Sequence, residues 1–404
     1  MTKMNTLTFD TLADAVKGHA AAFRSITTLQ PVGGVGDKIF PATFAEGKYA
    51  EETRRVNPGD PMSAQLKCIL LDSVASQANR AEEALLAAVR SGELVLPLIE
   101  VDFSEANTSL RVRLPNLTSL EVPHRLADAI LRDSQLEDGT RFSKSKAAAS
   151  WAKSTTWDAT GIYELCPTAL LFGMWGSPDK PGGLGAKFER AYVSEIVGVG
   201  TTDIPDRMGF RIDPLGASSK VLLTSPKADG SYELAEGKPK GSLKPSEMNH
   251  GNIVHDSKNG GARFAYVEQT TVVSLGALRK LRFPVGSKSS ADLDVTGRTV
   301  LAALGLCAGA LAGERGTSLR SRCHLWPTEA RAWQLLATPG IDPVSYSVTG
   351  AQAIELLKQA VTAAEAAGLA WQAAPIKLKP TKELVALIAK SQEVQAKETT
   401  EEGK

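Results

Sequence analysis

The order of apolar and polar residues changes period from segment to segment along this chain. Apolar residues that recur every three to four positions predict amphipathic helices, and strict alternation predicts half-buried strands. The helical period occurs at 9–24, 66–91 and 123–133, residues 298–312 are almost entirely apolar, and Thr349 begins a helix that stops at Gly368. Alternating or short apolar runs occur at 25–32, 94–101, 109–114, 190–199 and 263–275. Helices and strands are therefore mixed along the whole chain.

Helices alternate with strands in this order, but pairs of strands typical of hairpins also interrupt it. This combination predicts an α+β fold in which helices cover one face of a mostly antiparallel sheet. An RRM-like or ferredoxin-like β-α-β-β-α-β core with large insertions fits the order. Its elements would be a strand at 25–32, a helix at 66–91, strands near 94–114, a helix at 121–136 and a strand at 190–199.

The stretch 70–85 is the most informative of the predicted helices. At 100° per residue its apolar face holds Leu71, Val74, Ala78, Ala81, Leu85 and Val89, and the opposite side holds Ser73, Ser76, Gln77 and Arg80. Short hydroxyls, an amide and a guanidinium are groups that donate hydrogen bonds to phosphate and sugar oxygens. A polar surface helix with one exposed arginine explains the same pattern, so both interpretations remain open at this point.

Loop-rich segments divide the rest of the chain. Residues 45–63 are polar and interrupted by Gly and Pro, which predicts a flexible loop, and 200–260 hold many Gly, Pro and Lys, which predicts protruding hairpins. We expect one domain over 1–376 and a charged, flexible tail over 377–404.

Positive charge is concentrated locally, although the formal net charge is only +1. Residues 139–157 contain four basic residues and no acidic one, and 315–324 carry Arg315, Arg320, Arg322 and His324 without an acid. A net charge this small argues against a protein that coats nucleic acid over its whole surface, but it allows a local basic groove.

Aromatic residues are interleaved with the cations of 139–157. Phe142, Trp151 and Trp157 would stack on bases while the cations neutralise phosphates, as in grooves for single-stranded nucleic acid. The alternative is a solvated basic loop whose tryptophans anchor it to the core.

Motifs for catalysis or cofactors are missing from the sequence. The Gly-rich segments 33–38 and 182–188 match neither nucleotide-binding fingerprint, and His250, His255 and Asp256 lack the spacing of a metal site. The four cysteines show no CxxC pairing, which predicts free thiols in a reducing cytoplasm. No apolar run approaches the roughly 20 residues that cross a bilayer, so no membrane partner is expected. Binding, with no metal and no cofactor, is favoured over catalysis.

Six segments in one order carry a resemblance to a known family. They are 31–44 (ProValGlyGlyValGlyAspLysIlePheProAlaThrPhe), 70–85, 123–134, 167–177, 187–198 and 275–283. Together, over about residues 25–335, they resemble the RAMP-superfamily backbone subunit of type I-U (now I-G) CRISPR–Cas surveillance complexes.

The resemblance implies an RRM-like palm with a thumb within 200–260, a cytoplasmic location and no catalytic residues. It implies copies that assemble along one guide RNA (crRNA), pairing of that guide with target DNA, and contacts with a large subunit and with Cas five-type and Cas six-type subunits. The residues expected to hold RNA phosphates are Lys38, Ser73, Ser76, Gln77, Asn79 and Arg80, with Arg141, Lys144 and Lys146 extending the groove.

Two rival functions remain at this point. One is a ribonuclease that uses a loop aspartate, Asp37 or Asp256, since some relatives in type III complexes cleave bound RNA. The other is a small-molecule enzyme whose Gly-rich loops hold a phosphorylated ligand.

Overall fold

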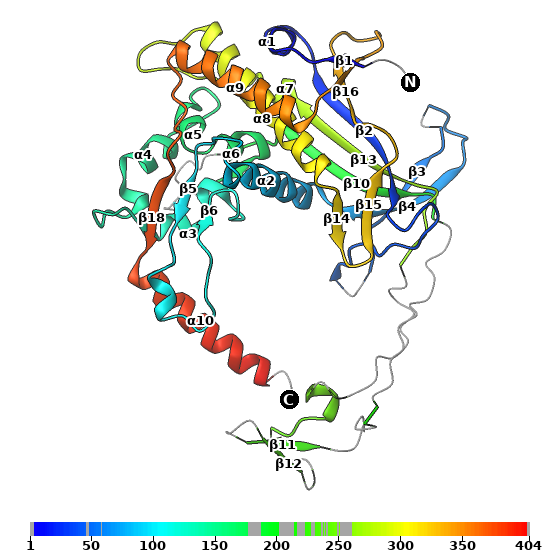
Figure 1. Ribbon diagram of the computed structural model, residues 1–404, viewed down its shortest axis with the longest axis vertical. Helices are drawn as coiled ribbons and strands as arrows, with labels where there is room; N and C mark the ends of the chain where they lie inside the picture. The colour runs from blue at the N-terminus through cyan, green and yellow to red at the C-terminus, as the bar shows by residue number, and fades with distance from the viewer. Residues whose placement is uncertain are drawn as a thin grey trace.

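The computed structural model describes residues 4–45, 48–57, 59–176, 187–201 and 261–401, together with short pieces between 214 and 250. These pieces are 214–215, 223–227, 231–235, 237, 239, 241–248 and 250. Figure 1 shows a large sheet on one side, a layer of helices against it, and a small sheet beyond the helices. The prediction of a mixed α+β fold is confirmed.

The large sheet has ten strands, and its main path runs β1-β17-β16-β2-β13-β10-β4-β3. The strands are β1 (Asn5–Thr6), β2 (Ala22–Pro31), β3 (Glu51–Arg55), β4 (Gln65–Asp72), β10 (Tyr192–Val199), β13 (Tyr266–Ser274), β14 (Thr317–Arg320), β15 (Cys323–Pro327), β16 (Ala332–Leu336) and β17 (Val344–Ser347). The β14–β15 hairpin joins this path by pairing β15 with β2. Every pair is antiparallel except β1 with β17.

Four long helices cover one face of this sheet: α1 (Phe9–Lys17), α2 (Val74–Arg90), α8 (Ala291–Glu314) and α9 (Gly350–Ala367). Alternate residues of the central strands point toward them, among them Phe23 of β2 and Val273 of β13, and are fully buried. Helix α8 lies at the centre, and a Cβ on its Gly309 would come within 2.7 Å of the Trp333 ring. Only glycine therefore allows β16 to approach so closely.

Helix α8 also corrects an expectation about membranes. Within the described part of the chain it is long and apolar enough to cross a bilayer, but 78% of its most apolar window is buried inside the protein. Burial of this kind is what the central helix of a large core requires, so the helix is explained without a membrane.

Shorter elements surround the long helices. A second sheet has the order β6-β5-β18-β7, with β5 (Ile99–Val101), β6 (Leu117–Thr118), β7 (Ser134–Gln135) and β18 (Ile376–Pro380). The short helices are α3 (Ala129–Arg132), α4 (Lys146–Ala152), α5 (Thr160–Leu165), α6 (Pro167–Phe172) and α7 (Leu275–Leu278). Two hairpins remain: β8 (Met174–Trp175) with β9 (Lys187–Phe188), and β11 (Thr224–Pro226) with β12 (Tyr232–Leu234).

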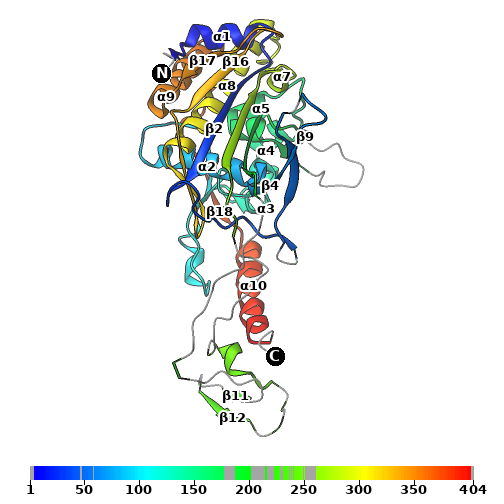
Figure 2. The same ribbon diagram turned by 90° about the vertical axis from the view of Figure 1, so that its right-hand side faces the viewer.

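The C-terminal region is more ordered than the sequence predicts. Strand β18 lies between β5 and β7, its Leu378 is buried, and α10 (Lys382–Glu401) follows it and projects from the body (Figure 2). The side chain of Gln392 on α10 exchanges two hydrogen bonds of 3.0 Å with the backbone of Val112. Strand β18 thus spans the boundary expected at 376/377 and joins the segment after it to the small sheet.

Several element boundaries also differ from the prediction. Residues 65–72 form β4 instead of the first turns of a helix, since Ile69 and Leu71 are buried in a strand paired on both sides. The predicted loop 45–63 contains β3, and the predicted helix at 9–24 ends at Lys17. The strands 190–199 and 263–275 and the helices 298–312 and 350–367 are confirmed as β10, β13, α8 and α9.

The segments expected to supply two further core elements are mostly irregular. Residues 94–114 contain only the short strand β5 and a 3₁₀ turn at Ala106–Thr108, and 121–136 contain only a 3₁₀ turn, α3 and β7. In place of a long helix, this region contains an internal ion pair. Arg125 binds Glu82 of α2 with two hydrogen bonds of 2.6 and 2.7 Å, and both residues are buried.

Candidate nucleic-acid interface

Two cations lie over one aromatic ring in the loop after β2. The Nζ atom of Lys38 is 5.7 Å from the centroid of the Phe40 ring, and Cζ of Arg322 is 5.2 Å from it. The backbone N–H of Phe40 donates to the carbonyl of Arg322 at 3.1 Å, which joins the loop after β2 to the tip of the β14–β15 hairpin. We call Lys38, Phe40 and Arg322 the Phe40 patch.

Arg322 adopts an unusual backbone conformation at this tip. Its φ is +55°, in the left-handed region that is unfavourable for a residue with a side chain. Such conformations persist where the surrounding structure imposes them, and they are concentrated at functional sites. Here the hairpin turn keeps a guanidinium over the Phe40 ring.

A buried aspartate holds the arginines beneath the patch. Asp72 is 3% exposed and lies at the end of β4. Its carboxylate accepts hydrogen bonds from Nε of Arg80 at 2.9 Å and Nε2 of Gln77 at 2.6 Å, and Nη2 of Arg320 lies 3.6 Å away. Two positive groups thus share one buried negative charge.

The remaining N–H groups of these arginines bind the backbone. Arg80 donates to the carbonyls of Ser318 and Leu319 at 3.0 and 2.9 Å, and Arg320 donates to those of Phe40 and Leu71 at 3.3 and 2.8 Å. Helix α2, β14 and the loop after β2 are therefore linked. This linkage brings Lys38 and Arg80, both expected at the site, into one region of the protein.

Ser73, Ser76 and Asn79, which were predicted to bind RNA, occupy different positions around the start of α2. Ser73 is the N-cap, and its hydroxyl accepts the Ser76 backbone N–H at 3.3 Å. Ser76 is half-buried and Asn79 is exposed on the following turn. Their contact with RNA stays a prediction.

Gln77 requires a correction, because it does not lie on an exposed face. Its side chain is 6% exposed, and Oε1 accepts hydrogen bonds from Ser194 at 3.1 Å and from Gln269 at 2.7 Å. Arg331 donates to Gln269 at 2.7 Å, and burial lowers the pKa of the Arg331 guanidinium. The amide of Gln77 thus belongs to a buried polar network between α2 and the sheet.

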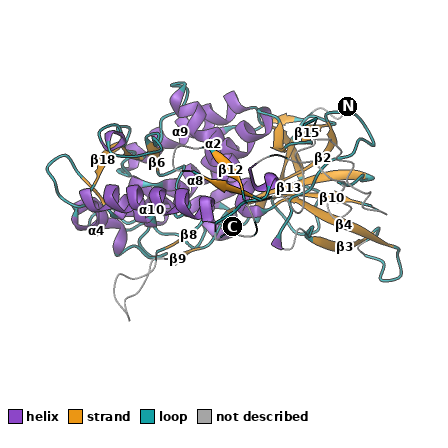
Figure 3. Cartoon of the chain, turned by 90° about the horizontal axis from the view of Figure 1, so that it is seen from below, coloured by secondary structure: helices purple, strands orange, loops and turns teal. Residues whose placement is uncertain are grey.

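The second predicted group of cations lies elsewhere. Arg141, Lys144 and Lys146 are near the start of α4, which lies at the opposite end of the molecule from β15 in Figure 3. The Arg141 guanidinium faces Glu383 at 3.4 Å. The sequence predicted that these cations extend the surface around Lys38. The structure contradicts that prediction, because they lie far from Lys38.

The aromatic residues of that segment also separate into two kinds. Phe142 is buried and Trp151 packs against the core, so both serve as anchors. Trp157 is 77% exposed, with Cζ of Arg282 6.0 Å from its ring centroid. Only one of the three is available for stacking.

Sequence reasoning missed Phe40, Arg320 and Arg322 as site residues. The basic cluster 315–324 was visible as a signal, but its position depends on pairing between β15 and β2. No period in the sequence reveals that pairing.

The loop aspartate and the Gly-rich loops give little support to a ribonuclease or to a small-molecule enzyme. The Oδ1 atom of Asp37 accepts the Lys38 backbone N–H at 2.8 Å, and Gly34 and Gly36 have positive φ, as tight turns require. Among the described residues, no three His, Cys, Asp or Glu side chains group together as a metal site would need. Residues 182–186, His255 and Asp256 lie outside the described residues.

Comparison with known protein families gives one finding. Residues 24–203 match the family described as CRISPR-associated protein GSU0053. No curated protein matches the chain. The matched range contains Lys38, Phe40, Asp72 and Arg80, and it overlaps most of the segments that carry the resemblance in the sequence. Residues 24–203 are therefore similar to the CRISPR-associated GSU0053 family.

Proposed function

We propose that the chain is a guide-RNA-binding backbone subunit of a type I-U/I-G CRISPR surveillance complex, and that copies of it assemble along one crRNA. The observation that carries the proposal is the Phe40 patch, where two cations lie 5.7 and 5.2 Å from one ring centroid, together with the match of residues 24–203 to a CRISPR-associated family. Lysine and arginine neutralise phosphates, and an aromatic ring beside them packs against a sugar or base.

The order of the central elements supports an RRM-like palm. Along the chain they run β2, α2, β10, β13, α8 and β16, and across the sheet the four strands lie in the order β16-β2-β13-β10. This is the split β-α-β arrangement of a β-α-β-β-α-β core. Strands β3 and β4 extend the sheet beyond β10.

The chemistry of the patch suits recognition of the RNA backbone. Guanidinium and ammonium groups bind phosphate at every position of a strand, so they position the RNA and leave sequence selection to pairing with target DNA. We infer a non-catalytic subunit, because the Asp37 carboxylate accepts a hydrogen bond from the backbone N–H of the next residue, Lys38, within its own loop. Within the thumb expected at 200–260, only short pieces such as β11 and β12 are described.

The remaining expected residues and partners belong to the same proposal. Ser76 and Asn79 would line the RNA next to Arg80, while Arg141, Lys144 and Lys146 would meet a separate stretch of nucleic acid or another subunit. The partners would be crRNA, target DNA, further copies of the chain and the other subunits of the complex, in the cytoplasm.

Purification of the tagged chain together with an expressed CRISPR array tests the assembly. We expect the purified protein to carry RNA, the RNA to contain the repeat and spacer of the array, and light scattering to give a mass of several chains per RNA. A nucleic-acid-free monomer purified from such cells would contradict the proposal.

A further inference from the structure

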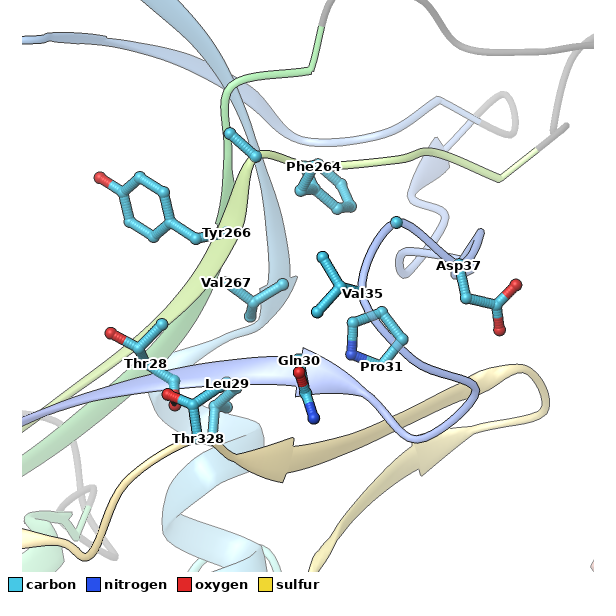
Figure 4. Close-up of a pocket in the computed structure, with 12 residues that line it drawn as sticks. Thr28, Leu29, Gln30, Pro31, Val35, Asp37, Phe264, Tyr266, Val267 and Thr328 are labelled. Atoms are coloured by element: carbon cyan, nitrogen blue, oxygen red, sulfur yellow. Dashed lines mark hydrogen bonds between the residues drawn. The ribbon is translucent and has the colours of Figure 1, made fainter.

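A cavity of about 110 Å³ opens where β2 and β13 diverge. The last paired residues of these strands are Leu29 and Val267, and beyond them the loop after β2 closes the gap (Figure 4). The lining comprises Thr28, Leu29, Gln30, Pro31, Val35, Gly36, Asp37, Phe264, Ala265, Tyr266, Val267 and Thr328. All of these residues are described.

The cavity combines apolar walls with a polar side. Phe264, Pro31 and Val35 converge around its centre in Figure 4, and Gln30 and Thr28 lie along β2. The side-chain amide of Gln30 has no hydrogen-bond partner among the described residues, and an amide offers both a donor and an acceptor. A flat ring with hydrogen-bonding edges matches these surfaces.

The volume limits the size of that ring. An enclosed apolar cavity of about 150 Å³ accommodates benzene. A slightly smaller cavity with one open side therefore suits a single six-membered ring, with its substituents at the mouth. A pyrimidine base has this size, whereas the fused rings of a purine exceed it.

The cavity is continuous with the Phe40 patch along the chain. Val35, Gly36 and Asp37 line the cavity, and Lys38 follows directly. Ile39 exchanges backbone hydrogen bonds of 3.0 and 2.8 Å with Ala262, which fixes this loop against the segment that leads to Phe264. A nucleotide whose phosphate lies on the patch would thus have the cavity within reach of its base.

We propose that this cavity binds one unpaired pyrimidine base of the RNA held by the Phe40 patch. The proposal rests on the proposed function and adds to it a subsite for a base. Contacts between the chain and RNA are then not confined to phosphates and sugars.

Photochemical cross-linking of the full chain tests the subsite. The probe is a single-stranded RNA that contains 4-thiouridine at one position in each of a series of oligonucleotides. The blocking variant is Val35→Trp, since Val35 is 86% exposed on a loop and a larger ring there fills the cavity without disturbing the core. The matched control is Met62→Trp, at a loop position 90% exposed.

At RNA concentrations that saturate each protein, we expect cross-links to residues 264–266 in the wild type and in Met62→Trp, and at least a tenfold loss of these cross-links in Val35→Trp. Gln30→Ala should reduce the same cross-links severalfold. RNA binding with cross-links only outside the cavity, or with a yield that Val35→Trp leaves unchanged, overturns the subsite and leaves the proposed function standing. Failure of the wild type to bind RNA overturns both proposals.

Discussion

Nε of Arg80 lies 2.9 Å from Oδ2 of Asp72, and the aspartate is almost completely buried while the arginine is partly exposed. Arg80 therefore neutralises the buried Asp72 charge, and it also donates to the backbone of β14, the strand of the hairpin that carries Arg322. A residue with these two roles affects folding as well as binding when it is replaced.

Replacement of Arg80 by alanine should destabilise the protein. The change removes one partner of the Asp72 carboxylate and two hydrogen bonds to the backbone of β14. Because Arg320 and Gln77 still face Asp72, we expect a loss of about 1–3 kcal/mol of unfolding free energy. Urea denaturation measures it, and unchanged stability would show that the ion pair contributes nothing. RNA binding by this variant is interpretable only after that measurement.

The Glu82–Arg125 pair predicts a larger effect on stability. Both side chains are buried and joined by two hydrogen bonds. Arg125→Ala leaves a buried carboxylate without its partner and should cost about 3–5 kcal/mol. The double variant Glu82→Gln/Arg125→Met should be less destabilised than Arg125→Ala, since no buried charge remains. Equal losses in the two variants would contradict this account.

Arg322→Gly distinguishes two effects of this residue: the cost of its left-handed backbone conformation and the binding contribution of its guanidinium. Glycine adopts a φ of +55° without a steric penalty, so the variant should be as stable as the wild type or more stable by about 0.5–1 kcal/mol. Its RNA affinity should fall, because a guanidinium over the Phe40 ring is lost. Thermal unfolding and RNA titration of the same sample measure the two effects. A decrease in stability would contradict the strain argument.

The buried thiols predict how stability depends on pH. Burial raises the pKa of Cys307 to about 12 and that of Cys323 to about 11, from the ordinary thiol value of 9.0. In the unfolded chain a thiol ionises above pH 9.0, whereas in the folded protein it keeps its proton. The stabilisation that each protonated thiol contributes is therefore fully present below pH 9. Above pH 9 the free energy of unfolding falls by about 1.4 kcal/mol per pH unit for each thiol, until the pH reaches the pKa of that thiol in the folded protein.

The variant Cys323→Ala isolates one of these contributions. Between pH 9 and 11 its unfolding free energy should fall less steeply than that of the wild type, by about 1.4 kcal/mol per pH unit. Parallel curves would show that Cys323 ionises equally in both states. At pH 8, the folded wild type should react slowly with a thiol reagent, and the urea-unfolded chain should expose all four cysteines.

The elements that sequence predicts best are those with local signals. Helix α9 begins at a capping box formed by Thr349 and Gln352 and ends at Gly368 in the left-handed conformation, and both signals are visible in the sequence. The boundary at Ser73 is harder, since 65–72 and 74–90 are both apolar on one side and only strand pairing separates them. The start of α2 could therefore not be predicted from the sequence, because it depends on pairing between strands that are distant in the chain.

The candidate site shows the same limit in its side chains. A polar face on α2 was expected to be exposed, but Gln77 is enclosed because β10 and β13 present Ser194 and Gln269 to it. Arg322 and Lys38 lie over the same Phe40 ring only because β15 pairs with β2. Polar residues can be found from a helical period, but the surface that they face depends on the sheet.

The salt dependence of RNA affinity tests the central claim most directly. The variant is Lys38→Ala/Arg322→Gly, and the control is Lys17→Ala/Lys358→Ala, which removes two exposed charges from α1 and α9. For a single strand, each lost phosphate contact lowers the slope of log affinity against log salt by about 0.7, so we expect a decrease of about 1.4 in the patch variant and none in the control. Equal slopes in wild type, patch variant and control would contradict an RNA-binding role for the Phe40 patch.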